Sequence, residues 1–149
     1  MTSWRDTASP QAQRDLDELL NAALGSAQQQ LARRGEFYPY AVAIRFDGQA
    51  EMIAARPEPT DEHPAARDVV TACVDELRSR QEQLRAGAIV SDIRLPGLNS
   101  SDAIDVSLEH AEGHALRVQL PYTRRRLGKE IDYGRLRAAP AGRQIWAHS

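Results

Sequence analysis

The sequence predicts an α+β fold, in which one antiparallel sheet of about five strands carries two long helices on one face. Three observations predict it. Two stretches repeat apolar residues at the spacing of a helix, five short stretches alternate as strands do, and most of the strands are joined at hairpin distance. The expected order is helix, two strands, helix and three strands, followed by an irregular tail.

The first helix is predicted over residues 10–34. Ser9 and Pro10 form a start signal, because serine caps free N–H groups and proline is well tolerated at the first helical position. Gly35 favours an end. The apolar stripe between them consists of Leu16, Leu19, Leu20, Ala23, Leu24, Ala27 and Leu31. Residues 1–8, which precede the helix, are expected to be disordered.

A β-hairpin is predicted next, because the apolar period changes to two. The residues expected on its buried face are Tyr40, Val42, Ile44 and Phe46. Asp47 and Gly48 mark the turn. A turn of three residues, 47–49, would set Ile44 opposite Met52 and keep the apolar residues on one face.

The second helix is predicted over residues 64–86. Its apolar stripe consists of Ala66, Val69, Val70, Cys73, Val74, Leu77 and Leu84. Cys73, the only cysteine of the chain, lies within this stripe. We therefore interpret it as a buried core residue and not as a nucleophile.

Three further strands are predicted over residues 89–95, 104–110 and 115–122. Matching the apolar faces of the last two sets Leu108 opposite Leu116 and Val106 opposite Val118. This register requires a three-residue turn at 111–113, with Gly113 where a left-handed backbone is needed.

No motif in the sequence indicates an enzyme. Neither a glycine-rich phosphate loop nor a GxSxG elbow occurs, so no catalytic residue and no cofactor is predicted. The element order is similar to that of roadblock-like and profilin-like modules, a likeness of topology alone. It implies association with protein, and we expect a non-catalytic interaction or regulatory module.

Composition indicates one domain over residues 1–149 and a cytoplasmic location. One cysteine cannot form an intramolecular disulfide, which fits a reducing compartment. No signal-peptide core and no membrane-length apolar run occurs, so no membrane partner is expected. The 18 arginines against one lysine indicate a GC-rich bacterial genome.

His110 and His114 are the weak candidates for a metal site. They face each other across the predicted turn, with Glu112 at its tip, so two imidazoles and a carboxylate could converge on a divalent ion. The alternative is a pair of solvated residues beside an exposed turn. We favour the alternative and predict no bound metal, because an exposed tip lacks second-shell partners.

Basic residues gather near the C-terminus, where residues 123–149 are expected to form an arginine-rich tail or loop. The candidate anion- or partner-binding residues are Arg124, Arg125, Arg126 and Lys129. The segment has three possible interpretations: a solvated tail docked on the acidic remainder of the molecule, a patch for an acidic protein partner, and a site for an anionic ligand or nucleic acid. The last is disfavoured because the formal net charge of the chain is −2 and two flanking tyrosines are too few for a stacking platform.

The first hairpin carries Ala41 and Ala43 on the face opposite its core residues. An apolar face of this kind is covered either by a second copy of the chain or by the tail that contains Ile145 and Trp146. Because twofold dimers are common, we expect a homodimer.

Overall fold

The computed structural model describes residues 7–55, 65–95, 101–124 and 130–146. Within them the chain forms two long helices, a short 3₁₀ turn and seven strands. The bounds in chain order are α2 Pro10–Arg34, β1 Tyr40–Arg45, β2 Ala50–Ile53, α3 Ala66–Ser79, η1 Gln81–Gln83, β3 Leu84–Leu95, β4 Ser101–His110, β5 Ala115–Arg124, β6 Ile131–Tyr133 and β7 Arg137–Pro140. Neither long helix has the length and apolar composition needed to cross a membrane.

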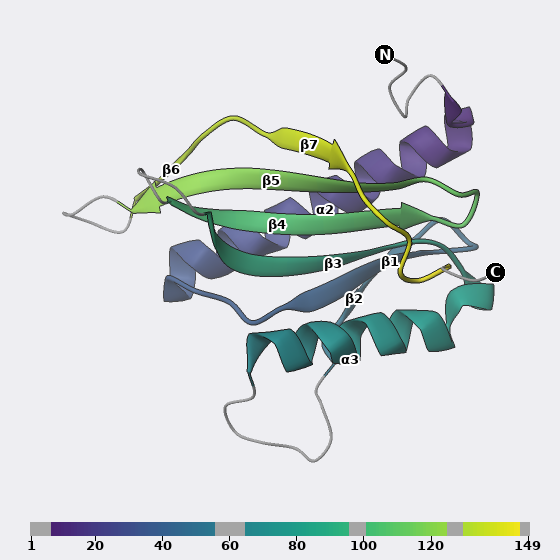
Figure 1. Ribbon diagram of the computed structural model, residues 1–149, viewed down its shortest axis with the longest axis horizontal. Coiled ribbons are helices and arrows are strands. Elements are labelled where there is room, and N and C mark those ends of the chain that lie inside the picture. The colour runs from purple at the N-terminus through teal and green to yellow at the C-terminus, as the bar shows by residue number, and fades with distance from the viewer. Residues whose placement is uncertain (1–6, 56–64, 96–100, 125–129, 147–149) are drawn as a thin grey trace.

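All strands belong to one antiparallel sheet, which confirms the predicted α+β class (Figure 1). The strand order is β2-β1-β3-β4-β5-β6, and β7 also pairs with β5. The strand count exceeds the expected five because the arginine-rich region 123–149, expected to be irregular, contributes β6 and β7. Residues 1–6, part of the segment expected to be disordered, lie outside the described residues.

The first helix begins and ends where its capping signals predict. The Ser9 side chain accepts a hydrogen bond of 3.1 Å from the Ala12 N–H, and Pro10 occupies the first helical position. At the other end Gly35 adopts φ 78° and donates its N–H to the Leu31 carbonyl at 2.9 Å. The left-handed backbone explains why glycine follows the last turn.

The two helices lie on opposite faces of the sheet, so the prediction of one shared face is wrong. The α2 stripe packs against the residues of β1 that have even numbers, together with the matching faces of β3, β4 and β5. Ala41 and Ala43 point the other way and pack against α3 residues Val69, Cys73 and Leu77. Strand β1 is therefore buried on both faces, and its small alanines leave room for the second helix.

The first hairpin has a three-residue turn, but its register differs from the predicted one by two residues. Val42 pairs with Met52 and Ile44 with Ala50, so the turn consists of residues 46–48. Gly48 adopts φ 87°, and this left-handed position sets the end of the turn. A shift of two residues keeps each face intact, but it leaves Phe46 in the turn and 63% exposed, not buried as predicted.

The second helix is shorter than predicted. It ends at Ser79, and Leu84 already begins β3, which was predicted to start at residue 89. Leu84 follows Leu77 at a helical spacing of seven and packs with it in the α3 cluster. Ala86, Ala88 and Val90 point to the other face, into the core beneath α2, because the register with β1 shifts between Ile44 and Arg45. Pairing of β3 with β1 and β4 decides in favour of the strand.

The hairpin of β4 and β5 has the predicted register. Leu108 pairs with Leu116 and Val106 with Val118. Gly113 adopts φ 116°, and its N–H donates to the His110 carbonyl at 2.9 Å. The predicted turn residues and the predicted match of the apolar faces are thus both confirmed.

The segment after β7 crosses the sheet and ends against the α3 face (Figure 1). Arg117 of β5 contacts Asp105 of β4 at 2.5 Å, whereas Glu109 turns to the C-terminal segment. The buried Glu109 carboxylate accepts three backbone N–H groups, from Gln144, Ile145 and Trp146, at 2.6, 3.1 and 2.5 Å. Ile145 and Trp146 pack into the cluster that holds Ala41 and Ala43. The apolar face that motivated the expected homodimer is therefore covered by α3 and this segment.

The turn at 111–113 supplies a first test. Gly113→Ala should lower the free energy of unfolding by about 1 kcal/mol or more, because φ is 116°, a backbone conformation that residues with a Cβ rarely adopt. Glu112→Ala should be nearly neutral, since that side chain is exposed and its 2.8 Å hydrogen bond from the Ser9 hydroxyl is a surface contact. Urea denaturation measures both, and equal losses would contradict the turn geometry.

A second test concerns Glu109. Glu109→Ala leaves three backbone N–H groups without their acceptor, so we expect a loss of at least about 2 kcal/mol in the free energy of unfolding. The exposed Glu82→Ala is the matched control and should change stability by less than about 0.5 kcal/mol. Equal stability of the two variants in urea would show that Glu109 does not hold the segment.

Candidate functional site

The predicted arginine cluster is only partly within the described residues. Arg124 ends β5, donates a hydrogen bond from Nη2 to the Gly35 carbonyl after α2, and lies with its guanidinium 5.9 Å from the ring centre of Tyr122. Arg125, Arg126 and Lys129 lie outside the described residues. The one described member of the cluster is thus tied to the end of a helix.

A polar contact lies beneath Arg124. The Tyr122 hydroxyl donates a hydrogen bond of 2.5 Å to Asp92 Oδ1. Burial is the main cause that raises the pKa of both side chains, and the hydrogen bond lowers the pKa of Asp92 in part. The contact joins β3 to β5 across β4 and holds the ring on which Arg124 lies.

His110 is a buried structural residue. Its Nε2 lies 2.9 Å from Asp15 Oδ2, and the Glu112 N–H donates to its Nδ1 at 3.1 Å. Since Nδ1 accepts, we assign the ring proton to Nε2, which donates to Asp15. Arg85 contacts the other oxygen of Asp15 at 2.8 Å. Both ring nitrogens are therefore engaged, and neither is available to a metal ion.

His114 faces His110 along the backbone, as predicted, because the His110 N–H donates to the His114 carbonyl at 2.8 Å. The two imidazoles do not form a ligand set, since His110 turns toward α2. Across the described ranges, no group of three or more His, Cys, Asp or Glu side chains is placed to hold a metal ion. Cys73 is buried, and burial raises the pKa of its thiol, which makes it a poor nucleophile.

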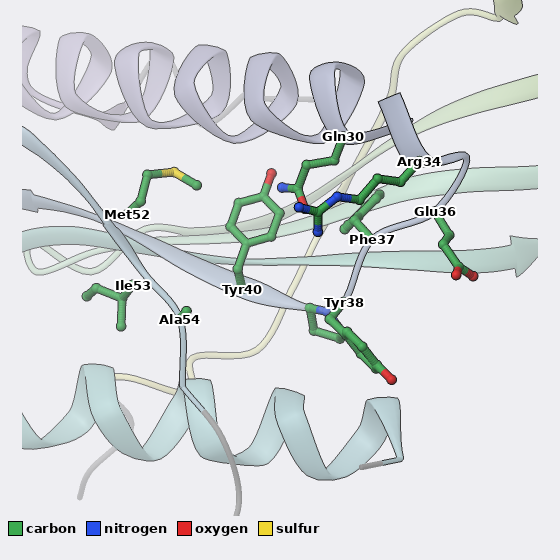
Figure 2. Close-up of a pocket in the computed structure, with 10 residues that line it drawn as sticks. Gln30, Arg34, Glu36, Phe37, Tyr38, Tyr40, Met52, Ile53 and Ala54 are labelled. Carbon is green, nitrogen blue, oxygen red and sulfur yellow. The ribbon is translucent and has the colours of Figure 1, made fainter. Parts of the chain in front are cut away.

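A groove of about 550 Å³ lies between the C-terminal half of α2 and strand β2 (Figure 2). Its lining residues are Gln30, Arg34, Glu36, Phe37, Tyr38, Pro39, Tyr40, Met52, Ile53 and Ala54. Figure 2 shows Tyr40 rising from β1 toward α2, with Met52 on one side and Arg34 on the other. An apolar floor with a few polar groups at the rim is typical of a binding site.

Tyr40 forms the inner wall of this groove and holds it to α2. Its hydroxyl donates a hydrogen bond of 2.6 Å to the Ala23 carbonyl, and its ring packs edge-on against Phe37 at 5.8 Å. Burial raises the pKa of Tyr40 to about 12. The groove is thus built on a fixed aromatic wall, whereas Met52 and Tyr38 are 50% and 48% exposed.

Strand β2 forms the edge of the sheet beside the groove. Arg45 and Gln49 form a hydrogen-bonded pair through a 3.0 Å contact, so by alternation Glu51 and Ile53 bond to β1. The N–H and C=O groups of Ala50 and Met52 then point outward. In the part of the chain that is described, no strand pairs with this outer side of β2. The edge and the groove form one continuous surface, which we call the β2 surface.

Sequence reasoning missed the β2 surface. Tyr38 and Pro39 stood in the connection between two predicted elements, and Met52 was assigned to the buried face of the hairpin. The pattern of β2 does not reveal that it is an edge strand, because the strand order is a property of the whole sheet. The aromatic residue Tyr38, in the short connection before the strand, was the one local feature that could have pointed to this surface.

The raised pKa of Tyr40 supplies a third test. The ordinary pKa of 10 applies in the unfolded chain, so the stability contribution of the neutral side chain is full below pH 10 and is lost as the pH rises through about 12. The free energy of unfolding should therefore fall over this range, and Tyr40→Phe should make the fall smaller. Part of the fall remains in this variant, because the pKa of Tyr122 is raised as well. Urea denaturation at several alkaline pH values measures the slope, and an unchanged slope in Tyr40→Phe would contradict the assignment.

The described residues form a groove beside an edge strand, and the polar contacts of Arg124 with Gly35, Tyr122 with Asp92, and His110 with Asp15 are structural. No protein-family model, curated protein or solved structure matches the chain.

Proposed function

We propose that this protein is a non-catalytic interaction or regulatory module that binds protein through the β2 surface. The ligand is an extended segment, either of a partner or of a second copy of the chain. It adds to β2 as a further strand and places an apolar side chain in the groove. Backbone hydrogen bonds contribute affinity in this mode, and the pocket selects the side chain.

The single observation that carries the proposal is the open outer side of β2 beside an apolar groove. Natural sheets usually protect such an edge by charge, proline or a covering element. Here the outward-bonding residues are Ala50 and Met52, both exposed and both uncharged. This edge is therefore suited to pairing with another strand.

The arginine-based alternative, binding of an anionic ligand or nucleic acid through residues 124–129, gains no comparable support. Arg124 is engaged by the Gly35 carbonyl and by the Tyr122 ring.

A cytoplasmic location remains part of the proposal, supported by the single cysteine, which is a free and buried thiol.

A displayed random-peptide library, selected on the full-length protein, tests the function. We expect enriched peptides with an extended apolar motif. Their binding should fall at least tenfold with Met52→Pro, which removes an outward N–H and leaves the ladder to β1 intact. Met52→Lys should have a similar effect, because a lysine on the edge opposes strand addition.

Gln29→Lys is the matched control, since it adds the same charge at an exposed position of α2 outside the groove. It should leave peptide binding unchanged. The urea midpoint of each variant shows whether the fold is kept. A library that yields no binder for a chain that also stays monomeric, or binding that persists in both Met52 variants, would overturn the proposed function.

A further inference from the structure

The first hairpin carries two exposed apolar features at its opposite ends. Phe46 lies in the turn and is 63% exposed, the largest exposed fraction among the large apolar side chains that are described. The groove lies at the other end of β2, where Ile53 and Ala54 contribute to its lining. One strand thus separates an exposed aromatic ring from a groove with aromatic walls.

Antiparallel pairing of two β2 strands would bring these features together. The outward groups of Met52 allow it to form a hydrogen-bonded pair with Met52 of a second copy, on a twofold axis. Ala50 then pairs with Ala54 of the second copy. Because the two strands run in opposite directions, the turn of each copy lies beside the groove of the other.

The residues of the two surfaces are chemically compatible. Phe37, Tyr40 and Met52 offer the ring-edge and thioether contacts that a phenylalanine ring favours. The rim of the groove carries Arg34 and Glu36. The turn carries Arg45 and Asp47, which are half exposed. Each side therefore offers one cation and one anion to the other, without an excess of like charge.

We propose that the occupant of the groove is Phe46 of a second copy, in a twofold dimer whose two sheets join through β2. This inference rests on the proposed function, because it names the partner of the same surface. Each copy contributes a residue to the site of the other, so the site is complete only in the dimer. Pairing also covers Met52, which is 50% exposed in the single chain.

Disulfide trapping tests the register. Met52→Cys should form a covalent dimer under mild oxidation, since the Cα atoms of a hydrogen-bonded antiparallel pair lie about 5.5 Å apart, within the range of a disulfide. Ala50→Cys is the control. It should not link to itself, because four residues of offset separate the two copies by about 13 Å along the strands. A mixture of Ala50→Cys and Ala54→Cys should link.

Light scattering on the full chain tests the role of Phe46. The wild type should approach the dimer mass as its concentration rises from the low micromolar range, and Phe46→Ala should weaken the dimer about tenfold or more. Leu136→Ala removes a similarly exposed side chain, 49% exposed and outside the β2 surface, and should have no effect.

A monomer mass at every concentration, trapping of Ala50→Cys with itself, or a Phe46→Ala dimer as tight as the wild type would overturn the inference. Peptide binding that depends on Met52 would then still support the proposed function with a different partner. Loss of both the dimer and peptide binding would overturn the two together.

Discussion

The structure depends on strand β1 being buried on both faces. The large side chains of Tyr40, Val42 and Ile44 pack against α2. The small alanines between them pack against α3 on the other face. Because a single helix cannot cover both faces, α2 and α3 are separated by the sheet. Strand β2, with only four residues, pairs with β1 on one side and ends the strand order of the described sheet. The β2 surface therefore lies next to the strand that both helices cover.

Buried polar groups then hold distant segments together. Glu109 accepts three backbone N–H groups of the C-terminal segment, and Asp15 of α2 accepts bonds from His110 and Arg85. Each carboxylate is almost fully buried, and each would be costly to bury without these partners. Glu109 therefore fixes the segment that completes the α3 face. Asp15 fixes the start of α2 against the sheet.

The two edges of the sheet differ in how they meet solvent. At the far edge, β7 carries Arg137 and Pro140, which oppose further pairing, and β6 is only three residues long. At the near edge, β2 presents outward backbone groups between alanine and methionine side chains. A fixed aromatic wall at Tyr40 stands beside it. This asymmetry is why the proposed strand addition is assigned to the β2 edge.

Local physics explains what the sequence by itself determined. Ser9, Pro10 and Gly35 bound α2 because capping acts within a few residues, and Gly113 with its matched apolar faces set the last hairpin. The α+β class could be predicted from the spacing of the apolar residues along the chain. Tertiary structure decided the rest: which face α3 covers, whether Leu84 joins a helix or a strand, and which strand forms the edge. Sheet pairing and burial on two faces bring together residues that are far apart in the sequence, so no local pattern predicts these features. The β2 surface exists only once the sheet is assembled.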